Sequence, residues 1–266
     1  MKIGFIGTGN MGGALARAAA KGGHTLLLAN RTPAKAEALA KELCGTVCPN
    51  AVAAEAAELL FLGVKPQGLP GLAGELAPVL QARKGNAPVV VSMATAVTLR
   101  ELDAMLGGGL PLIRIMPNTP AAVGAGTILY AAQNVTDAQL SAFRAVLAQA
   151  GLLLPLPEEK IDAASAISGC GPAFCFQFAD ALALGGVRAG LSYPDACRLA
   201  AQTMLGAAEM LLQGGEAPDV LKMRVCSPAG TTIEGVLALE QGGFSYTVQN
   251  AVTAAYRRTV DMTKKG

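Results

Sequence analysis

Short apolar runs alternate with longer segments of helical spacing along the first half of the chain. Glycine, proline or polar residues flank each run, which is typical of buried strands joined by helices. The predicted strands cover residues 2–6, 25–29, 59–64, 88–92 and 111–115. The predicted helices cover residues 12–22, 33–43, 69–80 and 98–106. This alternation predicts an α/β fold with a doubly wound, mostly parallel sheet of the Rossmann type.

The pattern changes near Pro157. From Glu158 onward the strand signals disappear, and alanine and leucine recur at helical spacing. The predicted helices cover residues 161–169, 172–189, 194–213, 218–223, 232–241 and 244–264. We therefore expect two domains, a Rossmann-like domain at residues 1–157 and an all-helical domain at residues 158–266.

A glycine-rich turn, residues 7–12, follows the first strand and opens the first helix. Gly7 permits a tight turn, Gly9 lets a ligand approach the backbone, and Gly12 lets the helix pack closely on the strand. The first N–H groups of the helix can then bind a pyrophosphate. A tight turn without a ligand is the alternative. The second strand at the expected distance favours dinucleotide binding.

The end of the second strand indicates which dinucleotide is preferred. An NAD site usually has a carboxylate there for the ribose 2′-hydroxyl, whereas this chain has Asn30 and Arg31. A guanidinium can bind a 2′-phosphate through charge-assisted hydrogen bonds, and Thr32 adds a hydroxyl donor. The alternative is that Arg31 is a solvated turn residue. The pattern favours NADP over NAD.

Composition narrows the class of protein. The chain has 266 residues, 52% of them hydrophobic, and a mean hydropathy of +0.42. Its uncharged stretches, residues 115–136 and 163–179, are interrupted by proline and glycine, so a packed core or a subunit interface explains the apolarity better than a membrane span. Cleavage of a signal peptide would remove the glycine turn, so we expect a cytoplasmic protein. The net charge of +2, without a basic block, gives no indication of nucleic-acid binding.

Histidine and cysteine usage limits the chemistry. The single histidine, His24, lies at the end of the sheet opposite the glycine turn, which argues against a histidine zinc site or a Ser-His-Asp triad. The chemistry must then come mostly from the cofactor. No metal site is expected. The cysteines are predicted to be small buried hydrophobic residues, at positions 44, 48, 170, 175, 197 and 226.

Two segments of the second half resemble anion-binding helix starts. They are residues 168–173, SGCGPA, and residues 227–232, SPAGTT. Small residues expose backbone N–H groups, which can hold a carboxylate without an arginine. However, Thr231 and Glu234 also have the spacing of a capping box, and spacing alone favours a cap without a ligand.

The motifs together extend this interpretation. Six motifs occur in order along the chain: GTGNMG at 7–12, NRT at 30–32, VKP at 64–66, RIMPNTP at 114–120, SGCGPA at 168–173 and SPAGTTIEG at 227–235. Along nearly its whole length the chain thereby resembles the pyrroline-5-carboxylate reductase family. The resemblance implies reduction of 1-pyrroline-5-carboxylate to L-proline with NADPH, and more weakly with NADH. It also implies a homodimer with intertwined helical domains, often assembled further into a decamer, and a site between two subunits.

The resemblance also implies roles for individual residues. The cofactor contacts fall on Gly7, Thr8, Gly9, Asn10, Met11, Gly12, Asn30, Arg31, Thr32, Asn50, Val64, Lys65, Pro66, Met93, Ala94 and Thr95. The substrate contacts fall on Ser168, Ser227, Gly230, Thr231 and Thr232, with Thr232 as the catalytic residue close to the ring nitrogen. The chain departs from the family pattern at Cys170, Phe174, Cys226, Ala229 and Ala96, the last two at positions where glycine is common.

Two rival functions compete with this interpretation. A β-hydroxyacid dehydrogenase shares the two-domain plan, but it has a catalytic lysine on the helix after a glycine-rich turn, and residues 172–188 contain no lysine. A non-catalytic NADP sensor would account for the first domain. It would leave residues 227–232 without a role.

Overall fold

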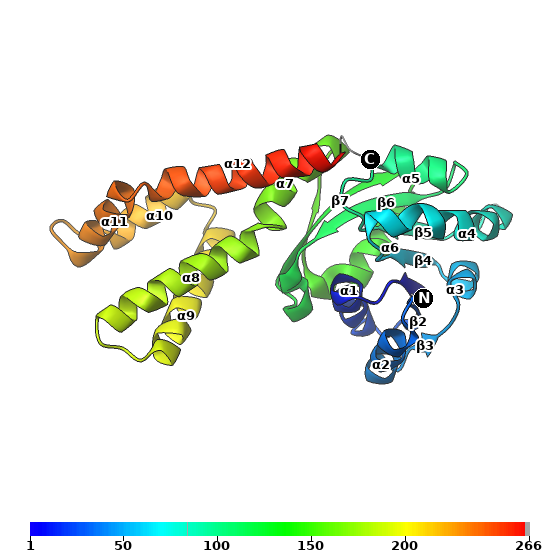
Figure 1. Cartoon of the computed structure of the whole chain (residues 1–266), viewed down its shortest axis with the longest axis horizontal. Helices are drawn as coiled ribbons and strands as arrows, with labels where there is room; N and C mark the ends of the chain where they lie inside the picture. The colour runs from blue at the N-terminus through cyan, green and yellow to red at the C-terminus, as the bar shows by residue number, and fades with distance from the viewer. Residues whose placement is uncertain (84, 264–266) are drawn as a thin grey trace. The chain divides into compact units, whose positions relative to one another are not determined.

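The computed structural model describes residues 1–83 and 85–263 (Figure 1). Its contacts divide the chain into two compact units. The first comprises Met1–Cys170 and the end of the chain from Ala255, and the second comprises Gly171–Ala254. The first unit thus includes α7 (Glu158–Ser168), which lies beyond the predicted boundary at Pro157.

Within the described residues, eight strands of the first unit form one sheet in the order β3-β2-β1-β4-β5-β6-β7-β8. The first six strands in this order, from β3 through β1 to β6, run parallel to one another. Strand β7 runs antiparallel to β6, and β8 runs parallel to β7. The predicted mostly parallel α/β fold is confirmed. The strands are β1 (Lys2–Ile6), β2 (Thr25–Ala29), β3 (Thr46–Val47), β4 (Leu59–Leu62), β5 (Val89–Ser92), β6 (Leu112–Pro117), β7 (Gly126–Gln133) and β8 (Gly151–Pro155).

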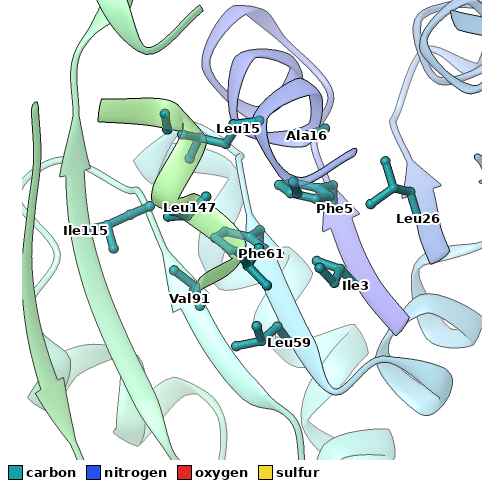
Figure 2. Packing of buried hydrophobic residues seen from close by; sticks show 14 of the residues in the cluster. Ile3, Phe5, Leu15, Ala16, Leu26, Leu59, Phe61, Val91, Ile115 and Leu147 are labelled. Atoms are coloured by element: carbon teal, nitrogen blue, oxygen red, sulfur yellow. The ribbon is translucent and has the colours of Figure 1, made fainter. Parts of the chain in front are cut away.

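Both faces of the sheet are covered by helices, so successive strand residues enter two different cores. The side chains of Ile3 and Phe5 pack with α1, α2 and α6, whereas that of Ile6 packs with α3, α4 and α5. Figure 2 shows the first of these cores, in which the rings of Phe5 and Phe61 are stacked with centroids 4.6 Å apart. The helices are α1 (Asn10–Ala20), α2 (Pro33–Leu43), α3 (Asn50–Ala56), α4 (Leu69–Ala82), α5 (Leu99–Met105) and α6 (Asp137–Leu147).

Five elements of the first unit lie outside the sequence prediction, namely β3, α3, β7, α6 and β8. Strand β3 has only two residues, too few for a periodic signal. Strand β7 returns from β6 through a short 3₁₀ turn, Thr119–Val123, so no intervening helix separates the two apolar runs. The alternation of helix and strand on which the prediction rested is interrupted at this point and resumes with α6 and β8.

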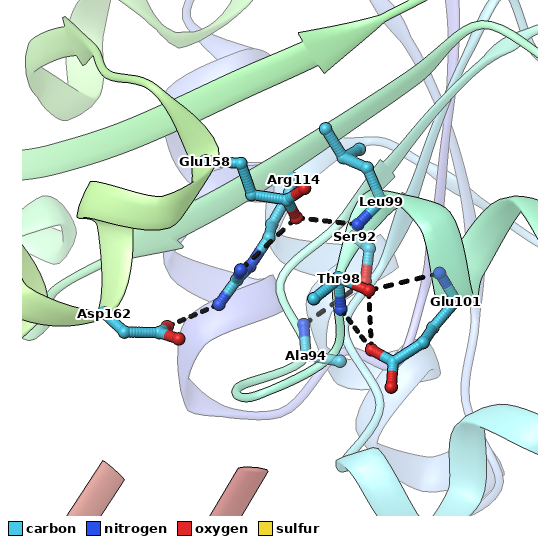
Figure 3. Close-up of polar contacts among 8 residues, drawn as sticks. All are labelled: Ser92, Ala94, Thr98, Leu99, Glu101, Arg114, Glu158 and Asp162. Carbon is cyan, nitrogen blue, oxygen red and sulfur yellow. Dashed lines mark hydrogen bonds and ion pairs between the residues drawn. The ribbon is translucent and has the colours of Figure 1, made fainter. Parts of the chain in front are cut away.

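A buried arginine holds α7 to the sheet (Figure 3). Arg114 of β6 is 2% exposed and forms ion pairs with Glu158, at 3.3 Å, and Asp162, at 2.5 Å. Glu158 also accepts a hydrogen bond from the backbone N–H of Leu99 at the start of α5. The first turn of α7 is therefore fixed to two elements of the first unit.

The second unit is helical, as predicted, and many of its large apolar side chains are exposed. By length and composition one stretch of the described residues, Glu158–Arg188, is apolar enough to cross a membrane. It is divided into α7 and α8 by Gly169 and Cys170, and its start is held by the buried Arg114. The helices of this part are α8 (Gly171–Arg188), α9 (Tyr193–Gly214), α10 (Pro218–Val225), α11 (Thr231–Gln241) and the first half of α12 (Phe244–Thr263), which from Ala255 onward is counted with the first unit.

The prediction that the cysteines are buried is wrong for the described chain. Cys44 and Cys175 are exposed, and the other four are partly exposed. Cys44 ends α2 in the left-handed conformation, with φ 54°, which turns it out of the core. Cys175 lies on α8, whose apolar surface is largely uncovered within one chain.

Candidate active site

The carboxyl-terminal ends of β1, β4, β5 and β6 meet at one edge of the sheet, where a cleft of about 370 Å³ opens. Residues from the loops after β1, β4 and β5 and from the end of β6 all contribute to it. Gly63, Met116 and Pro117 are additional lining residues, which their place at strand ends could have indicated. The complete lining is Gly9, Asn10, Met11, Gly12, Gly63, Val64, Lys65, Pro66, Met93, Thr95, Met116 and Pro117.

The glycine turn is built for close backbone contact. Gly7 has φ 96°, and a Cβ at this residue would lie 2.6 Å from the carbonyl oxygen of Gly63. A Cβ on Gly12 would lie 2.1 Å from the carbonyl oxygen of Gly7, so α1 can approach β1 only without one. A Cβ on Gly9 would meet no described atom within 4 Å. The space beside Gly9 is therefore open to a ligand, as dinucleotide binding requires.

The start of α1 offers an anion its backbone amides. Gly9 is the N-cap residue of α1, and no hydrogen bond from a described side chain caps this end. The hydroxyl of Thr8 is buried without a hydrogen-bond partner among the described residues. Unsatisfied N–H groups and the helix dipole favour a phosphate at this position.

The turn after β2 is tied to the glycine turn by one side chain. Asn30 accepts a hydrogen bond from the backbone N–H of Thr8 at 3.0 Å and donates one to the carbonyl oxygen of Thr32 at 3.0 Å. Arg31 lies between them and is exposed. Thr32 is the exposed N-cap residue of α2, without a side-chain cap among the described residues. A cation and a hydroxyl thus project at the end of β2, where no carboxylate is present.

Seven of the predicted cofactor residues do not line the cleft, namely Gly7, Thr8, Asn30, Arg31, Thr32, Asn50 and Ala94. Asn50 begins α3, next to the end of β3, and its amide donates to Glu75 of α4 at 3.0 Å. The side chain of Ala94 belongs to the core, where this residue is 2% exposed, and its N–H lies 3.3 Å from the hydroxyl of Ser92. Ala94 can reach a ligand only through its backbone.

Ser168 lies at the end of α7, in the first unit. The buried Asn118, which follows β6, donates to the carbonyl oxygen of Ser168 at 2.8 Å and accepts from the N–H of Thr127. The hydroxyl of Ser168 is buried and has no hydrogen-bond partner among the described residues. Asn118 was not predicted as a site residue, although it lies within the motif of residues 114–120. It positions the end of α7.

The other predicted substrate residues precede and begin α11, in the second unit. The N–H of Gly230 donates to the carbonyl oxygen of Ser227 at 3.0 Å, which closes a four-residue turn. Pro228 restricts its own φ, and Ala229 has φ 54°, so the turn is of type II. A Cβ on Gly230 would lie 2.2 Å from the hydroxyl of Ser227. A side chain at this position would require the hydroxyl of Ser227 to move.

The predicted capping box of Thr231 and Glu234 is wrong. Gly230 is the N-cap residue of α11, with φ −82° and ψ 170°, and Thr231 is already the first helical residue. No hydrogen bond from a described side chain caps this end. The turn before the helix moves the cap one residue back, onto a residue without a side chain. The first N–H groups of α11, including that of Thr232, remain for a ligand or water.

A parallel sheet with this glycine turn and a cleft over its carboxyl edge defines a Rossmann-type dinucleotide-binding protein with an added helical unit. Comparison with known proteins narrows the class. A family model described as NADP oxidoreductase, coenzyme F420-dependent, matches residues 2–96, and one described as pyrroline-5-carboxylate reductase dimerisation matches residues 158–262. The chain is 39% identical to the pyrroline-5-carboxylate reductase of Synechocystis sp., with 100% of this chain and 99% of the relative covered. The chain belongs to the pyrroline-5-carboxylate reductase family.

Other relatives and solved structures agree with this assignment. The pyrroline-5-carboxylate reductase of Methanosarcina acetivorans is 36% identical, with 99% of this chain and 98% of the relative covered. The structure of the Coxiella burnetii enzyme superposes with a TM-score of 0.89 at 30% identity, covering 97% of each chain. A Plasmodium falciparum pyrroline carboxylate reductase with NADP bound has a TM-score of 0.86 at 29% identity, covering 99% of this chain and 98% of that one.

Proposed function

We propose that the protein reduces 1-pyrroline-5-carboxylate to L-proline with NADPH, the last step of proline biosynthesis. The observation that carries this proposal is the full-length similarity to reductases of this name. The open space beside Gly9 and the uncapped start of α11 support it independently, because the first suits a dinucleotide and the second a carboxylate.

The residues of the cleft fit a phosphorylated dinucleotide. The start of α1 binds the pyrophosphate, and Arg31 with Thr32 binds the 2′-phosphate, so NADPH binds more tightly than NADH. Val64, Lys65 and Pro66 with Met93 and Thr95 border the nicotinamide side. When bound, NADPH supplies the hydride that the imine carbon accepts.

The residues at the start of α11 bind and orient the substrate. The N–H groups of Thr231 and Thr232 hold its carboxylate, with Ser227 and Gly230 shaping the turn before them. The hydroxyl of Thr232 accepts a hydrogen bond from the N–H of the protonated ring nitrogen. The imine arrives already protonated, so Thr232 positions the ring and does not carry bulk acid catalysis. Ser168, at the end of α7, is expected to add a hydroxyl to the substrate contacts.

A spectrophotometric assay tests the function. NADPH should be oxidised when 1-pyrroline-5-carboxylate is added, and NADP should not be reduced by a β-hydroxyacid. Tight NADPH binding without turnover would favour the sensor over the reductase. Reduction of NADP by the hydroxyacid, without turnover of the imine, would favour the dehydrogenase.

We further propose that the protein self-associates through its second unit. The match to the dimerisation model and the exposed apolar side chains of α8 to α12 support a homodimer. Assembly of dimers into a decamer and a cytoplasmic location stay predictions. Solution mass tests the first of these directly.

A further inference from the structure

The side chain of Asn30 connects the glycine turn after β1 to the turn after β2, the two turns proposed to bind the phosphates of the cofactor. The last backbone link between β1 and β2 is the hydrogen bond from the N–H of Gly7 to the carbonyl oxygen of Ala29, at 2.8 Å. Beyond this hydrogen bond the backbone segments that follow β1 and β2 are no longer paired, and the amide oxygen of Asn30 accepts a hydrogen bond from the N–H of Thr8. The side chain thus adds one link where the backbone of the second strand can no longer supply one.

The other end of the same amide fixes the turn that carries Arg31. It donates to the carbonyl oxygen of Thr32, which also accepts from the N–H of Lys35 in the first turn of α2. This contact closes the chain around Arg31 and holds it between two fixed residues. One short side chain therefore sets the position of the phosphate turn relative to the cation beside it.

We propose that Asn30 is a positioning residue for the cofactor, acting through the turn at Thr8 and the turn at Arg31. The proposal rests on the proposed binding of NADPH. Both ends of the amide are engaged with backbone groups, so the effect of Asn30 on a ligand passes mainly through these two turns. The pyrophosphate is common to NADPH and NADH, whereas the 2′-phosphate belongs to NADPH alone. A residue that positions both turns must therefore affect both ligands.

The test compares the dissociation constants of NADPH and NADH, measured by fluorescence titration of the full-length protein. Asn30→Ala should weaken both ligands, each by roughly three- to ten-fold, the range for one lost hydrogen bond. Arg31→Ala should weaken NADPH and leave NADH unchanged. The loss for NADPH in the double variant should be smaller than the product of the two single losses, because Arg31 is no longer held in place.

A conservative variant separates positioning from a general loss of stability. Asn30→Asp keeps an acceptor for the N–H of Thr8, so NADH binding should stay near that of the unmodified protein. NADPH binding should fall, because the new carboxylate repels the 2′-phosphate and cannot donate to Thr32. This variant decides the matter alone if Asn30→Ala does not fold.

Three results would overturn the role of Asn30. They are a loss by Asn30→Ala confined to NADPH, no loss for either ligand, or equal losses of both ligands in Asn30→Asp. If the unmodified protein bound neither nucleotide, the proposed function would fail first, and the role would fail with it. Binding by the unmodified protein combined with any of the three results removes only the role.

Discussion

At the scale of single residues, a substitution of Thr232 should affect turnover without affecting cofactor binding. Because its hydroxyl is expected to orient the ring, Thr232→Ala should lower turnover by about ten- to a hundred-fold, in the range for a lost positioning hydrogen bond. The dissociation constant of NADPH should not change. Thr232→Ser, which keeps the hydroxyl, should retain most of the activity. Reduction by Thr232→Ala at the unmodified rate would remove this role from Thr232.

Two alanines stand in a backbone conformation that favours glycine. Ala229 has φ 54° in the turn before α11, and Ala96 has φ 61° in the loop after β5. Their strain costs on the order of 1 kcal/mol each, so Ala229→Gly and Ala96→Gly should each raise the melting temperature by about 2–4 °C. Differential scanning calorimetry measures the change.

The matched control for these substitutions is Ala38→Gly. Ala38 is exposed in the middle of α2, where the same chemical change removes a good helix former. It should destabilise the protein by about 1 kcal/mol. Equal effects at all three positions would contradict the assignment of strain to Ala229 and Ala96.

The residues of the site were predictable to different degrees. The glycine turn was predictable because steric requirements at Gly7 and Gly12 leave no other residue type. The cap of α11 was not, because the spacing of Thr231 and Glu234 does not reveal that a type II turn places Gly230 at the cap. The contacts of Asn30 were also hidden, since they join segments that only the parallel pairing of β1 and β2 brings together.

At the scale of elements, a capping box fixes the start of α5, just after the cofactor loop. The backbone N–H and the hydroxyl of Thr98 each donate to Glu101 at 2.7 Å, and the hydroxyl accepts from the N–H of Glu101. Thr98→Ala should cost about 1 kcal/mol, as for other N-cap residues. A fall of the melting temperature by about 2–4 °C is the expected result.

The same box makes part of the stability depend on pH. The hydrogen bonds from Thr98 hold the pKa of Glu101 below its usual value of 4.5. Its contribution to stability is therefore complete above the usual value and is lost as the pH falls through the lowered one. The difference in melting temperature between the unmodified protein and Glu101→Gln should shrink on acidification. A difference that grows at low pH would contradict this sign.

The ion pairs of Arg114 with Glu158 and Asp162 connect α7 to the sheet, and the buried guanidinium needs a carboxylate partner. The arginine side chain is 3% exposed, whereas those of Glu158 and Asp162 are 26% and 24% exposed. The double variant Glu158→Gln with Asp162→Asn leaves a buried guanidinium without a carboxylate. It should lower the free energy of unfolding by about 3 kcal/mol in urea titrations. Glu159→Gln, at an exposed neighbour, should have little effect, and equal losses in both would exclude a specific role for the pairs.

At the scale of the whole molecule, the sequence predicted elements that have a local pattern and missed features that depend on contacts between distant segments. The parallel half of the sheet was predictable because each strand is a short apolar run between turns. Strand β7 was missed because no helix separates it from β6, and β8, which follows β7 through α6, was missed with it. The cysteines were mispredicted because apolar spacing does not show whether a helix face is covered by the same chain or by another.

The second unit leaves an apolar groove that one chain does not fill. Its volume is about 560 Å³, and its lining, drawn from α8, α9, α11 and α12, includes Phe174, Phe178, Leu182, Met204 and Leu239. Exposed apolar surface of this extent favours a second copy of the chain, as the match to a dimerisation model does.

A charge in this groove should separate the subunits. Leu182→Glu would bury an unpaired carboxylate at the interface, which is costly, so light scattering should show a shift from dimer toward monomer. Val52→Glu, at an exposed valine of α3, is the matched control and should keep the mass of the unmodified protein. NADPH binding should survive in both variants, because the cofactor cleft is complete within the first unit. Reduction of the imine should fail only in Leu182→Glu, since the family resemblance implies a substrate site between two subunits. A monomeric variant with full reductase activity would show that one chain suffices for catalysis.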